Sequence, residues 1–257
     1  MIDDHIFDDH IFDGIADKFA KNIYGTTKGN LRHTLLCDVL DSHLTSNSTV
    51  LEIGGGTGVM AAHLAALGHS VVLTDASNDV LQQAVGLFSQ SSNEAIRDNI
   101  EIRQEFLQEI TDFERFNVVI CHAVLEWLDN PYEALSSIYN RMKPGTIMSL
   151  SFFNHDANLF ANAIYGNFDY IEKGMKAKKQ VRLNPKQPLS AVKVLNYCES
   201  LGFTVLDKAG IRCFHDYMRD ISHQTTKYDD LLALERKYHK SDPYMWLGKY
   251  FQLIVEK

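Results

Sequence analysis

Four glycines follow a short apolar segment in the stretch VLEIGGGTG, at residues 50–58. Gly54, Gly56 and Gly58 stand where a buried strand would turn into a helix. Glycine suits such a turn because it adopts unusual backbone angles and lets a ligand approach the backbone closely. Asp75 ends the next apolar segment, 21 positions after Gly54. A carboxylate at that place can accept both hydroxyls of a ribose, so the spacing predicts a nucleoside site.

The glycine pattern differs from two familiar nucleotide-binding patterns. A dinucleotide fingerprint GxGxxG requires glycine or alanine at position 59, which is Val59 here. The stretch also lacks the GxxxxGK[ST] pattern of a phosphate loop. A nicotinamide dehydrogenase is therefore disfavoured, and a tight strand-to-helix turn that binds no cofactor stays open as an alternative.

A parallel sheet is the element that would bring these residues together. Strand-like and helix-like segments alternate along the chain, which is typical of βαβ units. Apolar runs predict strands within 49–55, 71–77, 100–106, 116–123, 146–154, 203–214 and 250–257. Periodic patterns predict helices within 15–24, 29–44, 58–69, 80–89, 131–142, 191–202 and 228–239. The segment 154–190, with Pro185 and Pro188, is interpreted as an irregular insertion after the fifth strand.

The composition is that of an acidic chain of 257 residues, with 25 Lys+Arg against 33 Asp+Glu and a formal charge of −8. This length suffices to bury one full core. The acidic balance argues against a general nucleic-acid coat or a binder of anionic membranes. The N-terminal MIDDHIFDDHIF is acidic and does not resemble a secretory signal, and FNVVICHAVLEWL is too short to span a bilayer. We therefore expect a cytoplasmic protein that does not bind membranes.

Metal chemistry finds little support in the sequence. The four cysteines are far apart and form no CxxC pair, which fits free thiols in a reducing compartment better than disulfides or a zinc site. His5 and His10 lie in a tandem DDHIF repeat, but a frayed tail is the better interpretation of residues 1–11. We expect no metal. The cysteines are Cys37, Cys121, Cys198 and Cys213.

A dense basic segment interrupts this acidic chain. Five cationic side chains and no acid fall between residues 173 and 182, and the rest of the chain has 20 basic against 33 acidic residues, or −13. A solvated loop is one interpretation, and a docking site for a polyanion is the other. Phe168, Tyr170 and Tyr217 can stack on nucleic-acid bases, although packing into the core is the more common role of aromatic side chains. The cations are Lys173, Lys176, Lys178, Lys179 and Arg182.

The pattern Glu52-x-Gly54-x-Gly56-x-Gly58 resembles motif I of the class I S-adenosylmethionine (SAM)-dependent methyltransferases. VVICHAVLEWLDNP is similar to their fourth-strand motif, and MKPGTIMSL to the turn before their fifth strand. The resemblance implies a Rossmann-like α/β fold in a single domain, 1–257, with helices on both faces of the sheet. That sheet has seven strands, mostly parallel, with an antiparallel last strand. An N-terminal helical segment and the insertion at 154–190 would be added to this core.

A closer resemblance covers the chain from about residue 12 to its end. FDGIADKFAKNIYGTTKGNLR, GNFDYIEKGMKAKKQVRLNP, GIRCFHDYMRD and LERKYHKSDPYMWLGKY are similar to blocks of the bacterial tRNA 5-carboxymethoxyuridine methyltransferases. That family uses SAM to convert the carboxylate of the modified wobble uridine to its methyl ester. The partner implied is the tRNA anticodon stem-loop, not DNA, with the basic segment on its phosphates. The sequence departs from the family pattern in two ways. Glu52 stands where aspartate is usual, and the basic segment has fewer lysines than is usual in the family.

Site residues follow from this resemblance. Asp75 would bind the ribose, Arg32 the methionine carboxylate, and two residues after the third strand would flank the adenine. The implied cofactor-binding set is Arg32, Glu52, Gly54, Gly55, Gly56, Asp75, Leu107, Gln108 and His122. A cation should orient the substrate carboxylate and offset its burial. The candidates for this, each of which can equally be structural, are Arg212 first and then His215, Tyr217 and Arg219.

The implied reaction needs no catalytic acid or base. The substrate carboxylate, with a pKa of roughly 3.5, is ionised at neutral pH, so proximity and alignment suffice for an in-line transfer. Two alternatives stay open. One is methylation of a small-molecule carboxylate or other small substrate, with the basic segment as a lid. The other is a SAM-binding scaffold without catalysis.

Overall fold

Seven strands form one sheet in the order β3-β2-β1-β4-β5-β7-β6. The structure, a computed structural model, describes residues 26–175 and 185–257. Strands β1 to β5 are parallel, and β7 pairs antiparallel with both β5 and β6. This confirms the predicted fold class. The strands are β1 (Thr49–Ile53), β2 (Ser70–Asp75), β3 (Ile100–Gln104), β4 (Val118–His122), β5 (Ile147–Phe153), β6 (Thr204–Ile211) and β7 (Tyr250–Glu256).

Helices follow most strands, as the alternating pattern predicted. Within the described residues, the α-helices are α2 (Thr27–Asp41), α3 (Val59–Ala66), α4 (Asn78–Ser89), α5 (Glu94–Asp98), α6 (Pro131–Arg141), α7 (His155–Ile164), α8 (Phe168–Glu172), α9 (Ala191–Leu201), α10 (His223–Thr226) and α11 (Tyr228–Tyr238). The expected helix at 15–24, the tail 1–11 and four cations of the basic segment (Lys176, Lys178, Lys179 and Arg182) lie outside the described residues.

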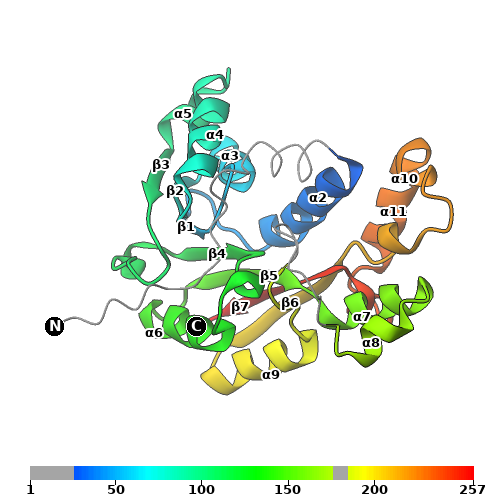
Figure 1. Ribbon diagram of the computed structural model, residues 1–257. Helices are drawn as coiled ribbons and strands as arrows, with labels where there is room; N and C mark the ends of the chain where they lie inside the picture. Colours follow the sequence, from blue (N-terminus) through cyan, green and yellow to red (C-terminus); the bar gives the residue numbers. More distant parts are fainter. Residues whose placement is uncertain (1–25, 176–184) are drawn as a thin grey trace.

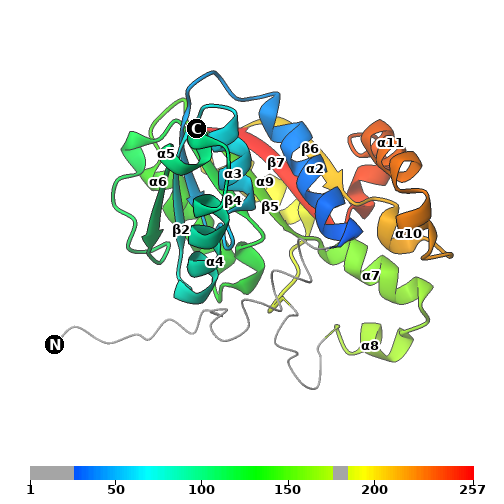
Figure 2. The same cartoon turned by 90° about the horizontal axis from the view of Figure 1, so that it is seen from above.

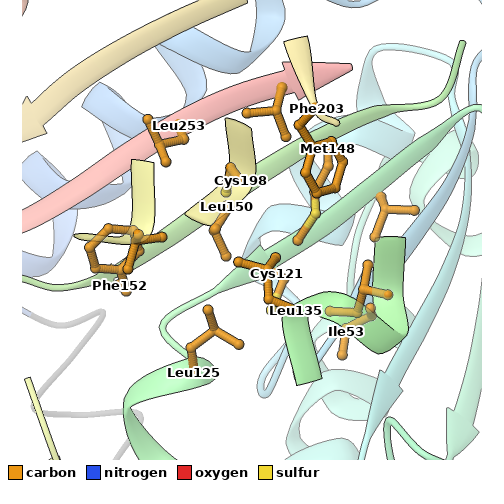
Figure 3. Close-up of a cluster of buried hydrophobic side chains, with 14 of the residues drawn as sticks. Ile53, Cys121, Leu125, Leu135, Met148, Leu150, Phe152, Cys198, Phe203 and Leu253 are labelled. Carbon is orange, nitrogen blue, oxygen red and sulfur yellow. The ribbon is translucent and has the colours of Figure 1, made fainter. Parts of the chain in front are cut away.

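Each face of the sheet has its own hydrophobic core. Helices α2, α3, α4 and α11 cover one face, and α6 and α9 cover the other (Figures 1 and 2). The central strands are buried on both faces, which explains their nearly continuous apolar sequences. Figure 3 shows the core under α6 and α9, where Leu135 and Cys198 lie among side chains of β5 and β7. The sheet is therefore held rigidly between two layers of helices, and its carboxyl edge is free to carry a site.

The interpretation of 154–190 as irregular is wrong for its first part, which forms α7 and α8. Asn154 caps α7, since its side chain accepts a hydrogen bond from the backbone N–H of Asp156. Ala157 and Ala161 are buried on one side of that helix. Asn154 also bridges to Leu189, so the two ends of the segment lie side by side. Helices α7, α8, α10 and α11 gather at one side of the molecule (Figures 1 and 2).

The cysteines and the lengths of the helices bear on two expectations from the sequence. All four cysteines are buried and unpaired, as predicted. Every helix in the described ranges is too short or too polar to cross a bilayer.

Candidate cofactor and substrate site

A cavity lies at the carboxyl edge of the sheet, where β1 and β4 end beside the first part of α2. Its lining is mixed, with cationic, acidic and apolar side chains around the glycine loop. The residues that line it are Arg32, His33, Leu36, Glu52, Gly54, Gly55, Met60 and His122. Five of the nine expected cofactor residues are thus brought together. His33, Leu36 and Met60 were missed, although Leu36 lies four positions after Arg32 and so falls on the same face of α2 by helical spacing.

The glycine loop after β1 has the backbone shape expected of a ligand cradle. Gly54 and Gly56 have φ angles of +63° and +59°, and Gly58 begins α3 with a φ of +76°. These left-handed conformations are unfavourable for side chains with a Cβ atom. A Cβ at Gly55 would lie 2.2 Å from Leu73 Cδ1 and 2.6 Å from the carboxyl carbon of Glu52. The loop therefore needs glycine for both conformation and space.

We expect Gly55→Ala to lower the free energy of unfolding by about 1–3 kcal/mol, the usual cost of overpacking a buried site. The same variant should bind the cofactor more weakly, because Leu73 and Glu52 must move. Gly86→Ala is the matched control, since a Cβ at that position in α4 meets no atom within 4 Å. Chemical denaturation should find the control as stable as the wild type or more so. Equal stability of Gly55→Ala and wild type would contradict the close packing described.

Asp75 connects the end of β2 to the glycine loop. One carboxylate oxygen accepts a hydrogen bond from the backbone N–H of Gly56 at 2.9 Å, and the other accepts one from Ser77 at 2.9 Å. The side chain is partly exposed, because Asp75 is the last residue of β2. It therefore lies at the same sheet edge as the cavity and also holds the loop in shape.

Glu52 is an acid buried beneath the glycine loop. Its Oε2 atom has no hydrogen-bond partner among the described residues. Burial raises its pKa to about 8, with the nearby Asp75 carboxylate acting in the same direction, whereas a hydrogen bond from the Ala61 backbone opposes the shift. A cation that enters the cavity would stabilise the ionised form of this carboxyl. The site is thus suited to a positively charged ligand.

The histidines of the cavity wall are neutral. His122 is hydrogen-bonded through Nε2 to Ser149 Oγ at 2.7 Å. Burial, together with the charge of Arg32, lowers the pKa of His122 to about 3. Burial and the neighbouring His63 likewise lower the pKa of His33 to about 4. Arg32 is therefore the cation of this wall, and His122 is too weak a base to take up a proton near neutral pH.

Leu107 and Gln108, expected beside the adenine, do not line this cavity. Both follow β3, the neighbour of β2 in the sheet. Leu107 is 8% exposed and packs into the core under α6, while its carbonyl oxygen accepts a hydrogen bond from Arg141. Their cofactor role stays a prediction that rests on the resemblance.

His33, Cys37 and His63 form a cluster beside the cavity, with ligand atoms within 4.8 Å of one another. In a tetrahedral zinc site such atoms are about 3.3–3.6 Å apart, and the cysteine is a thiolate. Burial raises the pKa of the Cys37 thiol, and the His63 ring is already hydrogen-bonded to the Asp41 carboxylate at 2.9 Å. We assign no metal to this cluster, and the expectation of a metal-free protein stays a prediction.

A second cavity lies at the opposite edge, among the amino ends of β1, β2 and β3. Ligands of open α/β sheets bind at the carboxyl ends of the strands. The cavity beside the glycine loop is therefore the candidate cofactor site.

The substrate-side candidates lie in the loop after β6, and most are already engaged. Arg212 is 7% exposed and pairs through two nitrogens with Asp216, at 2.8 and 2.6 Å. Although burial opposes it, the Arg212 charge and His215 hold the pKa of Asp216 below its usual range. The hydroxyl of Tyr217 donates to the carbonyl of Leu247 at 2.8 Å, and Arg219 is exposed. The charge of Arg212 is therefore balanced inside the protein.

Glu235, in α11, fixes the shape of that loop. Its buried carboxyl accepts hydrogen bonds from the backbone N–H groups of Cys213, Phe214 and His215, at 2.7 to 3.0 Å. These three hydrogen bonds satisfy the buried carboxyl and tie three consecutive backbone N–H groups of the loop to α11. The positions of Arg212 and Asp216 relative to the sheet are thereby well defined.

The aromatic candidates differ in exposure. Phe168 is 63% exposed at the start of α8, so core packing is the wrong interpretation for this residue. Tyr217 instead packs against Phe160 with ring centroids 5.3 Å apart, as a structural role predicts. Tyr170 is half-buried, and Lys173 is exposed at the end of α8. An exposed aromatic ring therefore lies shortly before the basic segment, and an exposed cation is its first residue.

Comparison with known proteins shows the family to which this chain belongs. Residues 30–207 match the family model of a methyltransferase domain. Over 251 residues the chain is 36% identical to the tRNA 5-carboxymethoxyuridine methyltransferase of Escherichia coli strain K12, and the match covers 95% of each chain. The chain belongs to this methyltransferase family. It is a SAM-dependent methyltransferase, which confirms the predicted enzyme class and cofactor.

Two further comparisons define how far other members of the superfamily match. A ubiquinone biosynthesis O-methyltransferase of Glaesserella parasuis is 32% identical over 130 residues, which are 48% of this chain and 52% of that protein. Magnesium protoporphyrin IX methyltransferase of Synechocystis, solved with bound SAH, superposes with a TM-score of 0.60 at 12% identity, covering 96% and 95% of the two chains. The structural likeness shows the fold alone. The full-length match does not favour the small-molecule or scaffold alternatives.

The cavity fits the cofactor of this family. SAM carries an ammonium and a sulfonium, and Glu52 offers a buried carboxyl oxygen with no partner among the described residues. Arg32 supplies the opposite charge for the methionine carboxylate. Gly54 and Gly55 line the cavity and offer it loop backbone that no side chain covers. Hydrogen-bond donors and acceptors that match the cofactor are thus present at one edge of the sheet.

Proposed function

We propose that this methyltransferase esterifies the carboxylate of 5-carboxymethoxyuridine at the wobble position of tRNA. The observation that carries the proposal is the match along nearly the whole chain to the E. coli enzyme of that name. The match includes the blocks outside the superfamily core, among them the loop after β6 and the segment around α8. Those blocks surround the expected substrate side of the sheet.

The proposed chemistry requires alignment rather than acid–base catalysis. When bound, SAM supplies a methyl group that is already activated by its positive sulfur. Arg32, Glu52 and Asp75 would hold it at the carboxyl edge, and the glycine loop would accommodate it. The substrate carboxylate is ionised, since its pKa is roughly 3.5. The neutral state of His122 is consistent with a transfer in which no proton moves.

The anticodon stem-loop is the proposed partner surface. Lys173 and the four cations that follow it in the sequence would contact phosphates, which positions RNA without reading its bases. The exposed ring of Phe168 offers a stacking surface for an unpaired base. A tRNA substrate would also place the protein in the cytoplasm.

Nucleoside mass spectrometry tests the proposed function. The purified protein is incubated with SAM and bulk tRNA that carries unesterified 5-carboxymethoxyuridine. We expect a nucleoside one methyl group heavier, which mild alkali converts back to the acid because it is an ester. Absence of this product, when SAM binding is demonstrable, would overturn the proposed substrate. Small carboxylic acids would then be the next substrates to assay.

The basic segment yields a separate prediction. Changing Lys176, Lys178 and Lys179 together to alanine should raise KM for tRNA and leave SAM affinity unchanged. Each lost phosphate contact should reduce the slope of log K against log salt concentration by about 0.7–0.9. Filter binding between low and moderate salt measures both effects. Lys193→Ala, an exposed lysine in α9, is the control. An unchanged slope in the triple variant would contradict phosphate contacts by these lysines.

A further inference from the structure

The carboxylate of the substrate lacks an obvious cationic partner among the residues first considered. Arg212 is bound to Asp216 through two hydrogen bonds, and Arg219 is exposed. Arg32 lines the cofactor cavity and is assigned to the cofactor. A cation whose charge is not already balanced, close to that cavity, is therefore the residue to look for.

Lys249 occupies such a position. It directly precedes β7, whose first residue Tyr250 pairs with Phe153, the last residue of β5. The backbone of Lys249 is fixed on both sides, since its N–H donates to the Arg212 carbonyl and its carbonyl accepts from the N–H of Asn154, each at 3.1 Å. Because β7 is antiparallel to β5, Lys249 lies at the carboxyl edge of the sheet, where the cofactor cavity also lies.

The ammonium of Lys249 lies over an aromatic ring and makes no ion-pair contact with a carboxylate in the described part of the chain. Its Nζ is 4.8 Å from the ring centroid of Phe153. Among residues 26–175 and 185–257, no carboxylate lies within 4.0 Å of this nitrogen. Burial lowers its pKa, while Asp216 acts in the opposite direction and Arg212 in the same one. A half-buried lysine in this state gains free energy from any anion that reaches it.

Two aromatic rings connect this lysine to the cofactor cavity. The Phe153 ring below the Lys249 ammonium packs edge-on against Tyr250, with ring centroids 5.7 Å apart. The guanidinium carbon of Arg32, which lines the cavity, lies 4.9 Å from the centroid of Tyr250. An anion held by Lys249 would thus lie beside the methionine end of the cofactor site, where a methyl acceptor is required.

We propose that Lys249 binds and orients the carboxylate that accepts the methyl group. This inference rests on the proposed function. An ammonium contacts a carboxylate as a single point charge, whereas a guanidinium binds both oxygens. One carboxylate oxygen therefore stays available. It attacks the methyl carbon, the bond from carbon to sulfur breaks, and the electron pair of that bond remains on sulfur. No proton is transferred, and the neutral ester no longer attracts the ammonium, which favours product release.

Substitutions at position 249 test this inference. Lys249→Met keeps an aliphatic chain over Phe153 but removes the charge, and Lys249→Arg keeps the charge. The matched control is Lys208→Met, because Lys208 lies 5.5 Å from the Trp246 ring, pairs opposite Leu253 in the sheet and is thus remote from the carboxyl edge. We expect Lys249→Met to lower kcat/KM for tRNA by about 10–100-fold, the usual effect of losing a charged hydrogen bond. SAM affinity should stay unchanged, and Lys249→Arg should recover part of the loss.

A binding measurement separates this role from a structural one. Two tRNAs are compared, one with 5-carboxymethoxyuridine and one with 5-methoxyuridine, which lacks the carboxylate. Wild type should prefer the first, and Lys249→Met should lose that preference. Equal weakening for both tRNAs, or unchanged kcat/KM, would overturn the role of Lys249 while the proposed function stands. If the wild type transfers no methyl group to the acidic nucleoside, the proposed function and this inference are both overturned.

Discussion

Asp75→Asn should weaken SAM binding by at least about 100-fold. The proposed role of the carboxylate is to accept two ribose hydroxyls, and charged hydrogen bonds of this kind contribute roughly 1.5–3 kcal/mol each. The amide keeps the size of the side chain but can accept through one atom only. It would also present N–H groups to Gly56 or Ser77, whose backbone N–H groups now donate to Asp75. The substitution should therefore weaken the cofactor contact and also disturb the conformation of the glycine loop.

Isothermal titration calorimetry measures this loss directly. Asp79→Asn is the matched control, since Asp79 lies four positions further along, in the first turn of α4. The control should bind SAM as the wild type does. Thermal denaturation without SAM should find both variants folded. Near-wild-type affinity in Asp75→Asn would mean that the cofactor lies elsewhere on the sheet.

Glu52→Gln should stabilise the protein at alkaline pH and weaken SAM binding at the same time. The folded-state pKa of Glu52, about 8, lies above the ordinary value of 4.5. Below about pH 4.5 the carboxyl is protonated in both states, so it has no effect. Between that pH and about 8 the unfolded chain gives up the proton and the folded chain keeps it, so the free energy of unfolding falls as pH rises. Glutamine cannot ionise and should remove this loss.

We expect the free energy of unfolding of Glu52→Gln to exceed that of the wild type by roughly 2–4 kcal/mol above pH 8 and by little near pH 5. Chemical denaturation at several pH values measures the difference. Glu133→Gln, an exposed position in α6, should behave as the wild type throughout. A constant difference between Glu52→Gln and wild type at all pH values would contradict the assignment. Weaker SAM binding is expected because the cofactor cations lose a buried carboxylate, a common conflict between stability and function.

The features that the sequence predicted are those determined by local chain geometry. Gly54, Gly56 and Gly58 were recognised because left-handed backbone angles require glycine, and the structure has those angles. The alternation of strands and helices predicted the sheet because the pattern of apolar residues in each segment indicates which of its side chains are buried. Helix α7 was missed because the prolines and lysines later in the same segment suggested an irregular loop. Its cap at Asn154 was a local signal that was available.

The substrate side was less predictable because its charges depend on partners distant in sequence. Arg212 was chosen for its charge, but Asp216 balances that charge once the loop is folded around Glu235. Lys249 has no distinguishing neighbours in the sequence. Its position beside Phe153 arises only when β7 pairs antiparallel with β5. Which cation remains available is thus a property of the folded sheet.

Two arginines contact the ring of Tyr250: Arg32, which lines the cofactor cavity, and Arg212, in the loop after β6. If SAM and tRNA bind on these two sides, each would change the electric field at the shared ring, so we expect the two ligands to be energetically coupled. Such coupling is reciprocal: the factor by which SAM alters the affinity for tRNA equals the factor by which tRNA alters the affinity for SAM. Methyl transfer removes the positive charge of the sulfonium and the negative charge of the carboxylate in one step. The coupling that favours simultaneous binding of the two substrates should therefore weaken once the products have formed, which favours their release.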